Sequence, residues 1–292
     1  MPAELLDGKK IAQEIRGEVA ERVKALQARG VTPGLAVILV GDNPASAVYV
    51  AAKGKACAEA GMHSETIRLT ADTTERDLLG RIDALNSDPR IHGILVQMPL
   101  PKQINAETVI ERIDPGKDVD CFHPINVGKM LTGERSGFLP CTPAGVQEMF
   151  RRAGVETKGK HCVIVGRSNI VGKPMAALMM QPGDGANCTV TVCHSGTRDL
   201  GAESRRADIL IVAIGKAKLI TAGMVKPGAV VVDVGMNRIP DASAKNGTRL
   251  VGDVDFEGVR GVASLITPVP GGVGPMTIAM LLMNTVRSAE MH

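Results

Sequence analysis

Residues 161–174 read HCVIVGRSNIVGKP, an apolar run followed by a glycine-bounded loop and the start of a helix. The run at 161–165 is typical of a buried strand, and Gly166 and Gly172 would let backbone N–H groups approach an anion at the helix N-terminus. The loop is neither of the two common fingerprints: five residues separate its glycines, and Pro174 replaces the Ser or Thr of a Walker A loop. The stretch predicts a nucleotide-binding unit, with an ordinary glycine-rich turn as the alternative.

The next apolar run, residues 189–193, indicates which cofactor such a unit would take. NAD sites usually place Asp or Glu at the end of the second strand, where the carboxylate bonds the ribose hydroxyls. Here the run continues into His194, Ser195 and Arg198 without an acid. Because Arg167 and Ser195 would suit a ribose 2′-phosphate, we expect NADP rather than NAD.

Strand and helix patterns alternate on both sides of this stretch, which predicts parallel sheets. The expected helices cover 9–28, 45–60, a segment from an Asp72 cap with Glu75 to about 85, one from Thr142, one from about 171, and 275–287. The expected strands cover 35–40, 66–69, 93–96, 161–165, 189–193, 209–213 and 229–234. Residues 114–141 are punctuated by Gly and Pro and should be irregular.

We therefore predict an α/β protein of two lobes with a cleft between them. One domain would cover 1–141, with a C-terminal helix at 275–292 packing back on it. A Rossmann-like nucleotide-binding domain would cover 142–274.

Composition limits the function. The 292 residues are 44% hydrophobic and 22% charged, as in ordinary globular proteins, and a net charge of +3 is too small for a nucleic-acid binder. Six cysteines without a CxxC pair, no signal peptide and no bilayer-length apolar run predict a cytoplasmic protein with reduced thiols. Cys121, His123 and Cys141 lack a fourth ligand, so we predict no metal site.

Polar side chains follow the predicted strands of the first half. Tyr49 and Lys53 are four residues apart and share one helix face, and Gln97 ends the strand at 93–96. Asp118 and Asp120 come after the next helix. Together they could bind a polar heterocycle. Taken singly, they could also be a solvated helix face, a turn cap, and carboxylates paired with a neighbouring lysine.

Five motifs carry a family resemblance: YVAAK at 49–53, QMPLP at 97–101, KDVD at 117–120, the loop at 166–172, and PGGVGPMT at 270–277. In this order they resemble the bifunctional methylenetetrahydrofolate dehydrogenase/methenyltetrahydrofolate cyclohydrolase family, over essentially the whole chain. The resemblance implies NADP-dependent oxidation of 5,10-methylenetetrahydrofolate to 5,10-methenyltetrahydrofolate, then hydrolysis to 10-formyltetrahydrofolate. It also implies a cytoplasmic homodimer in one-carbon metabolism and purine biosynthesis. A monofunctional dehydrogenase and a non-catalytic folate or nucleotide sensor are the alternatives.

The resemblance also assigns roles. Lys53 would be the acid/base residue, Tyr49 would pack beside it and contact substrate, and Gln97 would orient its amine. Asp120 would hold the pterin, and Pro270 and Gly271 would contact folate. The implied cofactor residues are Gly166, Arg167, Ser168, Ile170, Gly172, Ser195 and Thr277. Cys121 stands where the family usually has Gly, so we expect a different local shape in that loop.

Overall fold

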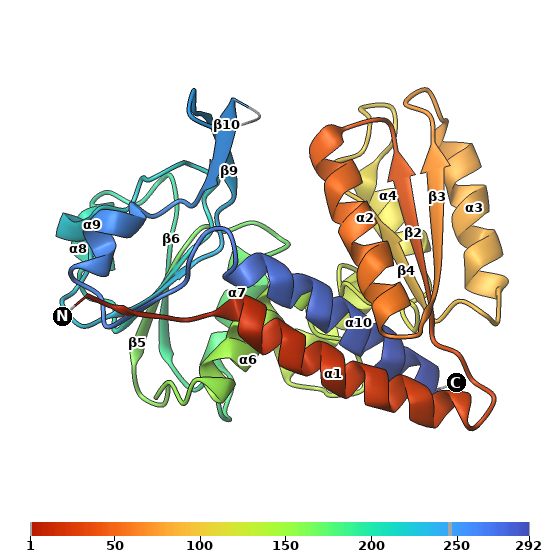
Figure 1. The fold of residues 1–292 in the computed structure, drawn as a ribbon, viewed down its shortest axis with the longest axis horizontal. Coiled ribbons are helices and arrows are strands. Elements are labelled where there is room, and N and C mark those ends of the chain that lie inside the picture. Colours follow the sequence, from red (N-terminus) through yellow and green to blue (C-terminus); the bar gives the residue numbers. More distant parts are fainter. Residues whose placement is uncertain (1, 245–246, 292) are drawn as a thin grey trace. The chain divides into compact units, whose positions relative to one another are not determined.

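The computed structural model describes residues 2–244 and 247–291 (Figure 1). Its contacts divide the chain into two compact units. We call them the three-stranded unit (13–141 and 278–291) and the six-stranded unit (2–12 and 142–277), after their main sheets. The predicted α/β class, with two parallel sheets, is confirmed. No helix within the described ranges is long and apolar enough to cross a membrane.

The three-stranded unit contains a parallel sheet in the order β3-β2-β4. Its strands are β2 (Gly34–Val40), β3 (His63–Leu69) and β4 (Gly93–Val96), and every residue of β2 and β4 is buried. One face packs on α3 (Glu75–Ser87) and α4 (Ala106–Arg112) through Ile38, Ile94 and Leu78. The other helices are α2 (Pro44–Glu59), α5 (Pro124–Thr132), most of α1 (Gly8–Gln27) and most of α10 (Val273–Met291).

The last helix is tied into this unit by side chains of its C-terminal half. Asn284 Nδ2 donates to the carbonyls of Val119 (2.8 Å) and Leu139 (2.9 Å). Ser288 Oγ donates to the Gly116 carbonyl at 2.9 Å. These bonds hold the segment between α4 and α6, which includes the KDVD motif.

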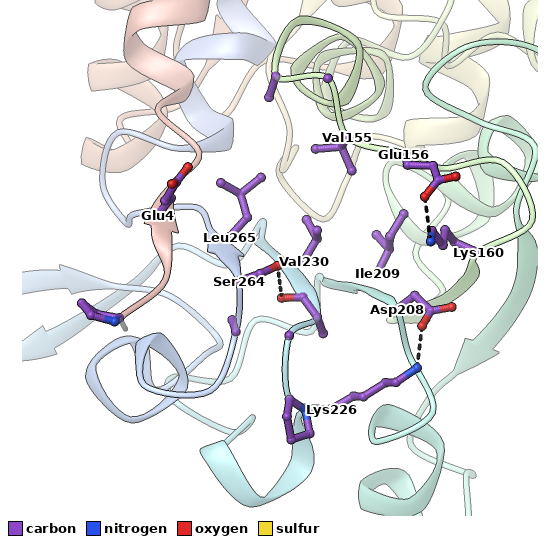
Figure 2. A pocket seen from close by; sticks show the side chains of 17 residues that line it. Glu4, Val155, Glu156, Lys160, Asp208, Ile209, Lys226, Val230, Ser264 and Leu265 are labelled. Atoms are coloured by element: carbon purple, nitrogen blue, oxygen red, sulfur yellow. Dashed lines mark hydrogen bonds and ion pairs between the residues drawn. The ribbon is translucent and has the colours of Figure 1, made fainter.

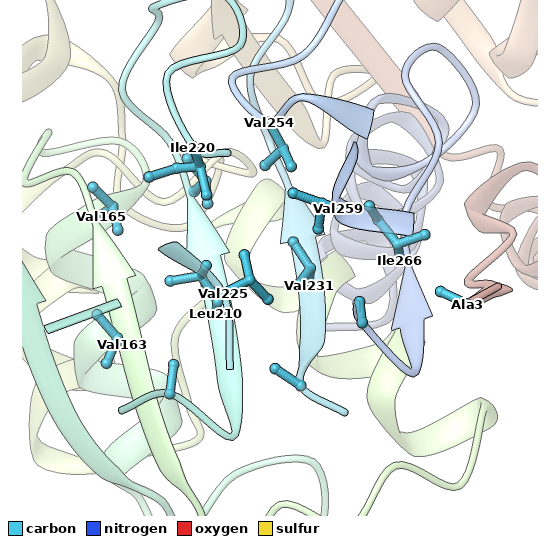
Figure 3. Packing of buried hydrophobic residues seen from close by; sticks show 14 of the residues in the cluster. Ala3, Val163, Val165, Leu210, Ile220, Val225, Val231, Val254, Val259 and Ile266 are labelled. Atoms are coloured by element: carbon cyan, nitrogen blue, oxygen red, sulfur yellow. The ribbon is translucent and has the colours of Figure 1, made fainter. Parts of the chain in front are cut away.

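The six-stranded unit has the strand order β1-β11-β8-β7-β5-β6, parallel throughout. Its strands are β1 (Glu4–Leu5), β5 (His161–Val165), β6 (Thr189–Cys193), β7 (Ile209–Val212), β8 (Val230–Asp233) and β11 (Leu265–Ile266), beside a hairpin of β9 (Asn237–Pro240) and β10 (Thr248–Val251). Its helices are α6 (Cys141–Arg152), α7 (Gly172–Met180), α8 (Leu200–Ser204), a 3-10 turn at Ala222–Met224, and α9 (Phe256–Arg260). Alternate strand residues such as Val163, Leu210 and Val231 form the core on one face (Figure 3).

The chain reverses its direction across this sheet at β5. It moves outward from β5 to β6 and then returns to β7 on the opposite side of β5. In open parallel sheets, ligands bind outside the carboxyl ends of the strands at such a reversal. The segments that leave β5 and β7 are therefore the expected place for a nucleotide.

Several boundaries differ from the sequence-based prediction. The cap of α3 is Thr74, not Asp72: its Oγ1 accepts the Asp77 N–H at 3.2 Å. The segment expected to be irregular contains α5, which His123 caps and which ends at Gly133. Helix α6 begins one residue before Thr142. Although we assigned 1–141 to one domain, β1 pairs with β11 in the six-stranded sheet.

Candidate functional site

A lysine and a glutamine meet at the carboxyl end of β4. Lys53 lies on α2 with only 7% of its surface exposed, and its Nζ donates to Gln97 Oε1 at 3.0 Å. The Gln97 N–H continues the sheet by donating to the Ile38 carbonyl (2.8 Å), and Nε2 donates to the Met98 carbonyl (2.8 Å). Because both groups are fixed, the amide oxygen is presented to the lysine.

The charge state of the Lys53 amine is set by opposing effects. Burial lowers the pKa of Lys53, while the carboxylate of Asp120 and the thiol of Cys141 act to raise it. Burial in turn raises the pKa of Asp120, against the influence of Lys53. Tyr49 is half-buried on the same helix, and burial raises the pKa of its phenol. An amine with a depressed pKa is suited to exchanging protons near neutrality.

Asp118 shapes the loop that carries Asp120. It is buried and accepts the N–H groups of Phe122 (3.1 Å) and His123 (2.9 Å) and the side-chain amide of Asn126 (2.9 Å). Burial raises the pKa of Asp118 to about 6. Asp118 is therefore a structural carboxylate, and Asp120 is the member of the motif that influences the lysine.

Lys117 does not pair with either aspartate of the motif. Its Nζ donates to the carbonyls of Leu85 (3.0 Å) and Asp88 (2.9 Å), at the end of α3. The lysine therefore anchors the start of the loop to a helix terminus.

Cys121 departs from the expectation for this loop. Its φ is 59°, in the left-handed region that favours glycine. The chain thus accepts a cysteine at a glycine-like conformation, and the expected change of local shape is not seen at this residue. Its neighbour His123 caps α5 by accepting the Ile125 N–H at 3.1 Å, and the Cys141 thiol donates to the Val119 carbonyl at 3.3 Å. Cys141 influences Lys53 but was not among the predicted site residues.

The glycine loop of the six-stranded unit is built for close backbone approach. Gly166 has a φ of 133°, and a Cβ there would lie 2.2 Å from the Ala213 carbonyl oxygen. A Cβ on Gly172, the first residue of α7, would lie 2.2 Å from the Gly166 carbonyl oxygen. Ser168 Oγ accepts the N–H groups of Val171 (3.2 Å) and Gly172 (3.4 Å), where the loop enters the helix. The tight turn at a helix N-terminus fits a phosphate.

The exposed side chains around this loop fit a phosphorylated ribose. Arg167 and Ile170 are exposed on the loop, and Ser195 is exposed just after the adjacent strand β6. A turn presents Ser195: the His194 N–H donates to Thr197 Oγ1 (2.9 Å), and the Gly196 N–H donates to His194 Nδ1 (3.0 Å). The Arg167 guanidinium and the Ser195 hydroxyl follow the ends of β5 and β6, and neither strand runs directly into an acidic residue. This combination suits the 2′-phosphate of NADP.

The glycine- and proline-rich segment 268–277 also belongs to the six-stranded unit, and its residues from Val273 onward form the start of α10 rather than a loop. Pro270 is exposed, and Gly271 has a φ of 105° and accepts the Lys9 N–H at 2.9 Å. The hydroxyls of Thr277 and Thr142 share a hydrogen bond of 2.9 Å. The structure thus places the predicted residues in two groups: Tyr49, Lys53, Gln97 and Asp120 in one unit, and the others in the second unit.

A pocket lies at the amino-terminal edge of the six-stranded sheet, opposite the glycine loop (Figure 2). Its volume is about 1080 Å³, and Ile209, Val230 and Leu265 line it from the amino-terminal ends of their strands. Its lysine amines are paired, Lys160 with Glu156 (2.8 Å) and Lys226 with Asp208 (2.6 Å). None of the predicted site residues line this pocket, so we do not assign the chemistry to it.

Comparison with known proteins gives matches to both halves of the chain. Residues 6–120 match the tetrahydrofolate dehydrogenase/cyclohydrolase catalytic domain, and residues 140–292 match the NAD(P)-binding domain of the same family. A bifunctional protein FolD from Chlorobium limicola is 60% identical over 288 residues, covering 98% of this chain and 97% of the relative.

Solved structures agree with these matches. A bifunctional FolD methylenetetrahydrofolate dehydrogenase/cyclohydrolase from Campylobacter jejuni superposes with a TM-score of 0.93 at 50% identity, covering 99% of both chains. The Trypanosoma brucei dehydrogenase-cyclohydrolase, complexed with NADP and an inhibitor, gives a TM-score of 0.94 at 40% identity, covering 100% of this chain and 98% of that one. The chain belongs to the tetrahydrofolate dehydrogenase/cyclohydrolase family.

Proposed function

We propose that the chain oxidises 5,10-methylenetetrahydrofolate to 5,10-methenyltetrahydrofolate with NADP and then hydrolyses the product to 10-formyltetrahydrofolate, with Lys53 as the acid/base residue. The observation that carries the assignment is the 3.0 Å contact between the buried Lys53 amine and the fixed Gln97 amide. Burial lowers the pKa of this amine, and the Gln97 acceptor gives it a defined direction, as proton transfer requires.

For the oxidation, bound NADP supplies the redox chemistry by accepting a hydride from the one-carbon bridge. The chain's part is binding and orientation. The turn between Gly166 and Gly172 would hold the diphosphate by backbone N–H groups, with Ser168 and Ile170 beside it. Arg167 and Ser195 would hold the 2′-phosphate, and Thr277 would contact the cofactor from the start of α10.

For the hydrolysis, the chain must manage protons. Water adds to the cationic methenyl carbon and gives one proton to the neutral Lys53 amine. The bond from that carbon to N5 then breaks as N5 takes up this proton and the new hydroxyl loses its own to water, which leaves a formyl group on N10. Gln97 keeps the amine directed at the reacting water. Asp120 would hold the pterin through charge-assisted hydrogen bonds, and Tyr49, Pro270 and Gly271 would contact the folate.

The pKa of Lys53 decides whether this step can run. The pKa of a lysine must fall from its reference value by about 3 units, which corresponds to about 4 kcal/mol, before the amine is neutral near pH 7. Burial acts in that direction, and the positive charge of the methenyl substrate would add to it.

A spectrophotometric assay tests the proposed function. With methylenetetrahydrofolate we expect reduced cofactor to form faster with NADP than with NAD, and we expect methenyltetrahydrofolate to be hydrolysed by the same preparation. If the chain oxidised the substrate but did not accelerate hydrolysis, it would be a monofunctional dehydrogenase. The Lys53–Gln97 contact favours the bifunctional reading. If neither reaction occurred, a non-catalytic sensor would be the better description.

Three finer assignments accompany this proposal. The chain would act in the cytoplasm as a homodimer and supply one-carbon units to purine biosynthesis. The family resemblance supports them. Sedimentation of the purified chain tests the dimer, because a monomeric mass at micromolar concentration would contradict it.

A further inference from the structure

Two buried carboxylates lie together at the carboxyl edge of the six-stranded sheet. Asp233 is the last residue of β8, and Asp253 lies between β10 and α9; their exposed fractions are 3% and 0%. Each packs against a glycine from the other's segment. A Cβ on Gly252 would lie 1.7 Å from Asp233 Oδ2, and a Cβ on Gly235 would lie 2.2 Å from Asp253 Cγ. Neither Gly235 nor Gly252 could therefore carry a side chain without displacing one of the two aspartates.

Asp253 binds the segments that leave two neighbouring strands. Its Oδ2 accepts the N–H groups of Ile214 (2.6 Å) and Gly215 (2.8 Å), just after β7. Its Oδ1 accepts Nδ2 of Asn237 (2.8 Å), after β8. One carboxylate thus joins the segment 213–215 to the segment 234–237.

Asp233 in turn holds the loop that carries Asp253. Its Oδ1 accepts the N–H of Asp253 and that of Gly235, both at 2.9 Å, and its Oδ2 accepts the Val254 N–H at 2.9 Å. Val254 is itself packed in the core of the unit (Figure 3). The backbone of Asp253 is therefore fixed by the hydrogen bonds to Asp233 and by the packing of Val254.

The segment after β7 is in direct contact with the glycine loop. The Ala213 N–H donates to the Val165 carbonyl at 2.8 Å, and the Ala213 carbonyl lies where a Cβ on Gly166 would be. No side chain separates the two segments at that point. A displacement of Ile214 and Gly215 would therefore also displace the backbone turn at Gly166.

We propose that Asp253 is a positioning residue for the dinucleotide: it holds the segments 213–215 and 234–237 in the conformation that lines the cofactor site beside the Gly166 turn. This rests on the proposed function, because it assumes that NADP binds at this edge. Asp253 would act on the cofactor through the groups that its carboxylate binds, the N–H groups of Ile214 and Gly215 and the Asn237 amide. Its effect should appear in cofactor affinity and leave folate affinity unchanged.

Calorimetric titration of the full chain with NADP, and separately with a folate analogue, tests this inference. In Asp253→Ala, Ile214 and Gly215 lose their acceptor, so we expect NADP to bind about tenfold more weakly or worse. Asp253→Asn keeps one oxygen for both N–H groups, and a rotated Asn237 amide can accept from its new NH₂. We expect this conservative variant to bind NADP within about threefold of the wild type. Asp255→Ala is the matched control.

The control is suitable because Asp255 lies two residues away, is only partly buried and pairs with Lys218 at 3.6 Å. A folded Asp253→Ala protein that binds NADP as the wild type does would overturn the inference, and so would an equal loss of folate affinity. If Asp253→Ala does not fold, Asn237→Ala decides: about threefold weaker NADP binding supports the role, and unchanged binding overturns it. If the wild type binds no NADP, the proposed function fails instead.

Discussion

Replacing Gln97 by methionine should change how Lys53 titrates during hydrolysis. Methionine is unbranched and of similar size but offers the amine no comparable acceptor. The wild-type acceptor lies 3.0 Å from Nζ and favours the ammonium form. Hydrogen bonds to charged groups contribute about 1.5–3 kcal/mol, so losing this one should lower the pKa of Lys53 further.

The measurement is the rate of methenyltetrahydrofolate hydrolysis as a function of pH, corrected for the uncatalysed reaction. We expect the rising limb that reports the neutral amine to move to lower pH in Gln97→Met. The maximal rate should fall about 10- to 100-fold, because the amine is no longer directed. The affinity for a folate analogue should change little.

Gln103→Met is a matched control, because Gln103 is exposed and its amide donates to the Ala71 carbonyl at 2.7 Å. Its pH profile should equal that of the wild type. The reasoning is refuted if Gln97→Met leaves the midpoint of the limb in place and instead weakens folate binding. Gln97 would then contact substrate without acting through the lysine.

Three further results are expected. Burial raises the folded-state pKa of Asp118 from 3.8 to about 6, so between those pH values the folded protein binds more protons than the unfolded chain. The free energy of unfolding should therefore fall by about 3 kcal/mol as pH rises from 3.8 to about 6. Urea melts of Asp118→Asn should lack this pH-dependent component. At Cys121, whose φ is 59°, the glycine variant should be about 1 kcal/mol more stable than the alanine variant in urea melts, and the opposite order would argue against a left-handed residue there. Gly8→Ala would place a Cβ 2.0 Å from the Gly272 carbonyl oxygen, so it should cost about 1–3 kcal/mol and weaken folate binding, whereas Gly17→Ala, in open space on the same helix, should not; equal melting curves for the two variants would contradict the close approach.

Sequence patterns located several strands accurately, because short runs rich in β-branched and apolar residues between turn signals favour strands. The strands at 93–96, 161–165 and 189–193 have the predicted boundaries. The sequence patterns also placed the Lys53 helix and Gln97 at one edge of the sheet, and the resemblance predicted the contact between them. What identified the chemistry, however, was the family resemblance, since a lysine and a glutamine have no distinctive spacing of their own.

Elements that depend on distant partners were missed. Strand β1 has only two residues and exists because β11 pairs with it. Helix α5 was overlooked although Pro124 and Gly133 are the start and stop signals of a helix, because its 9 residues are too few to show a clear helical period. The buried Asp253 gave no periodic signal. A glycine directly before it was the only local sign of a crowded backbone.

The most direct test of the central claim is the rate at which Lys53→Met hydrolyses methenyltetrahydrofolate, measured beside its calorimetric affinity for NADP. We expect hydrolysis to fall by about 100-fold or more, because the proton-transferring group is gone, while NADP binds with wild-type affinity. Hydrolysis at the wild-type rate by a folded Lys53→Met protein would contradict the role given to this buried amine.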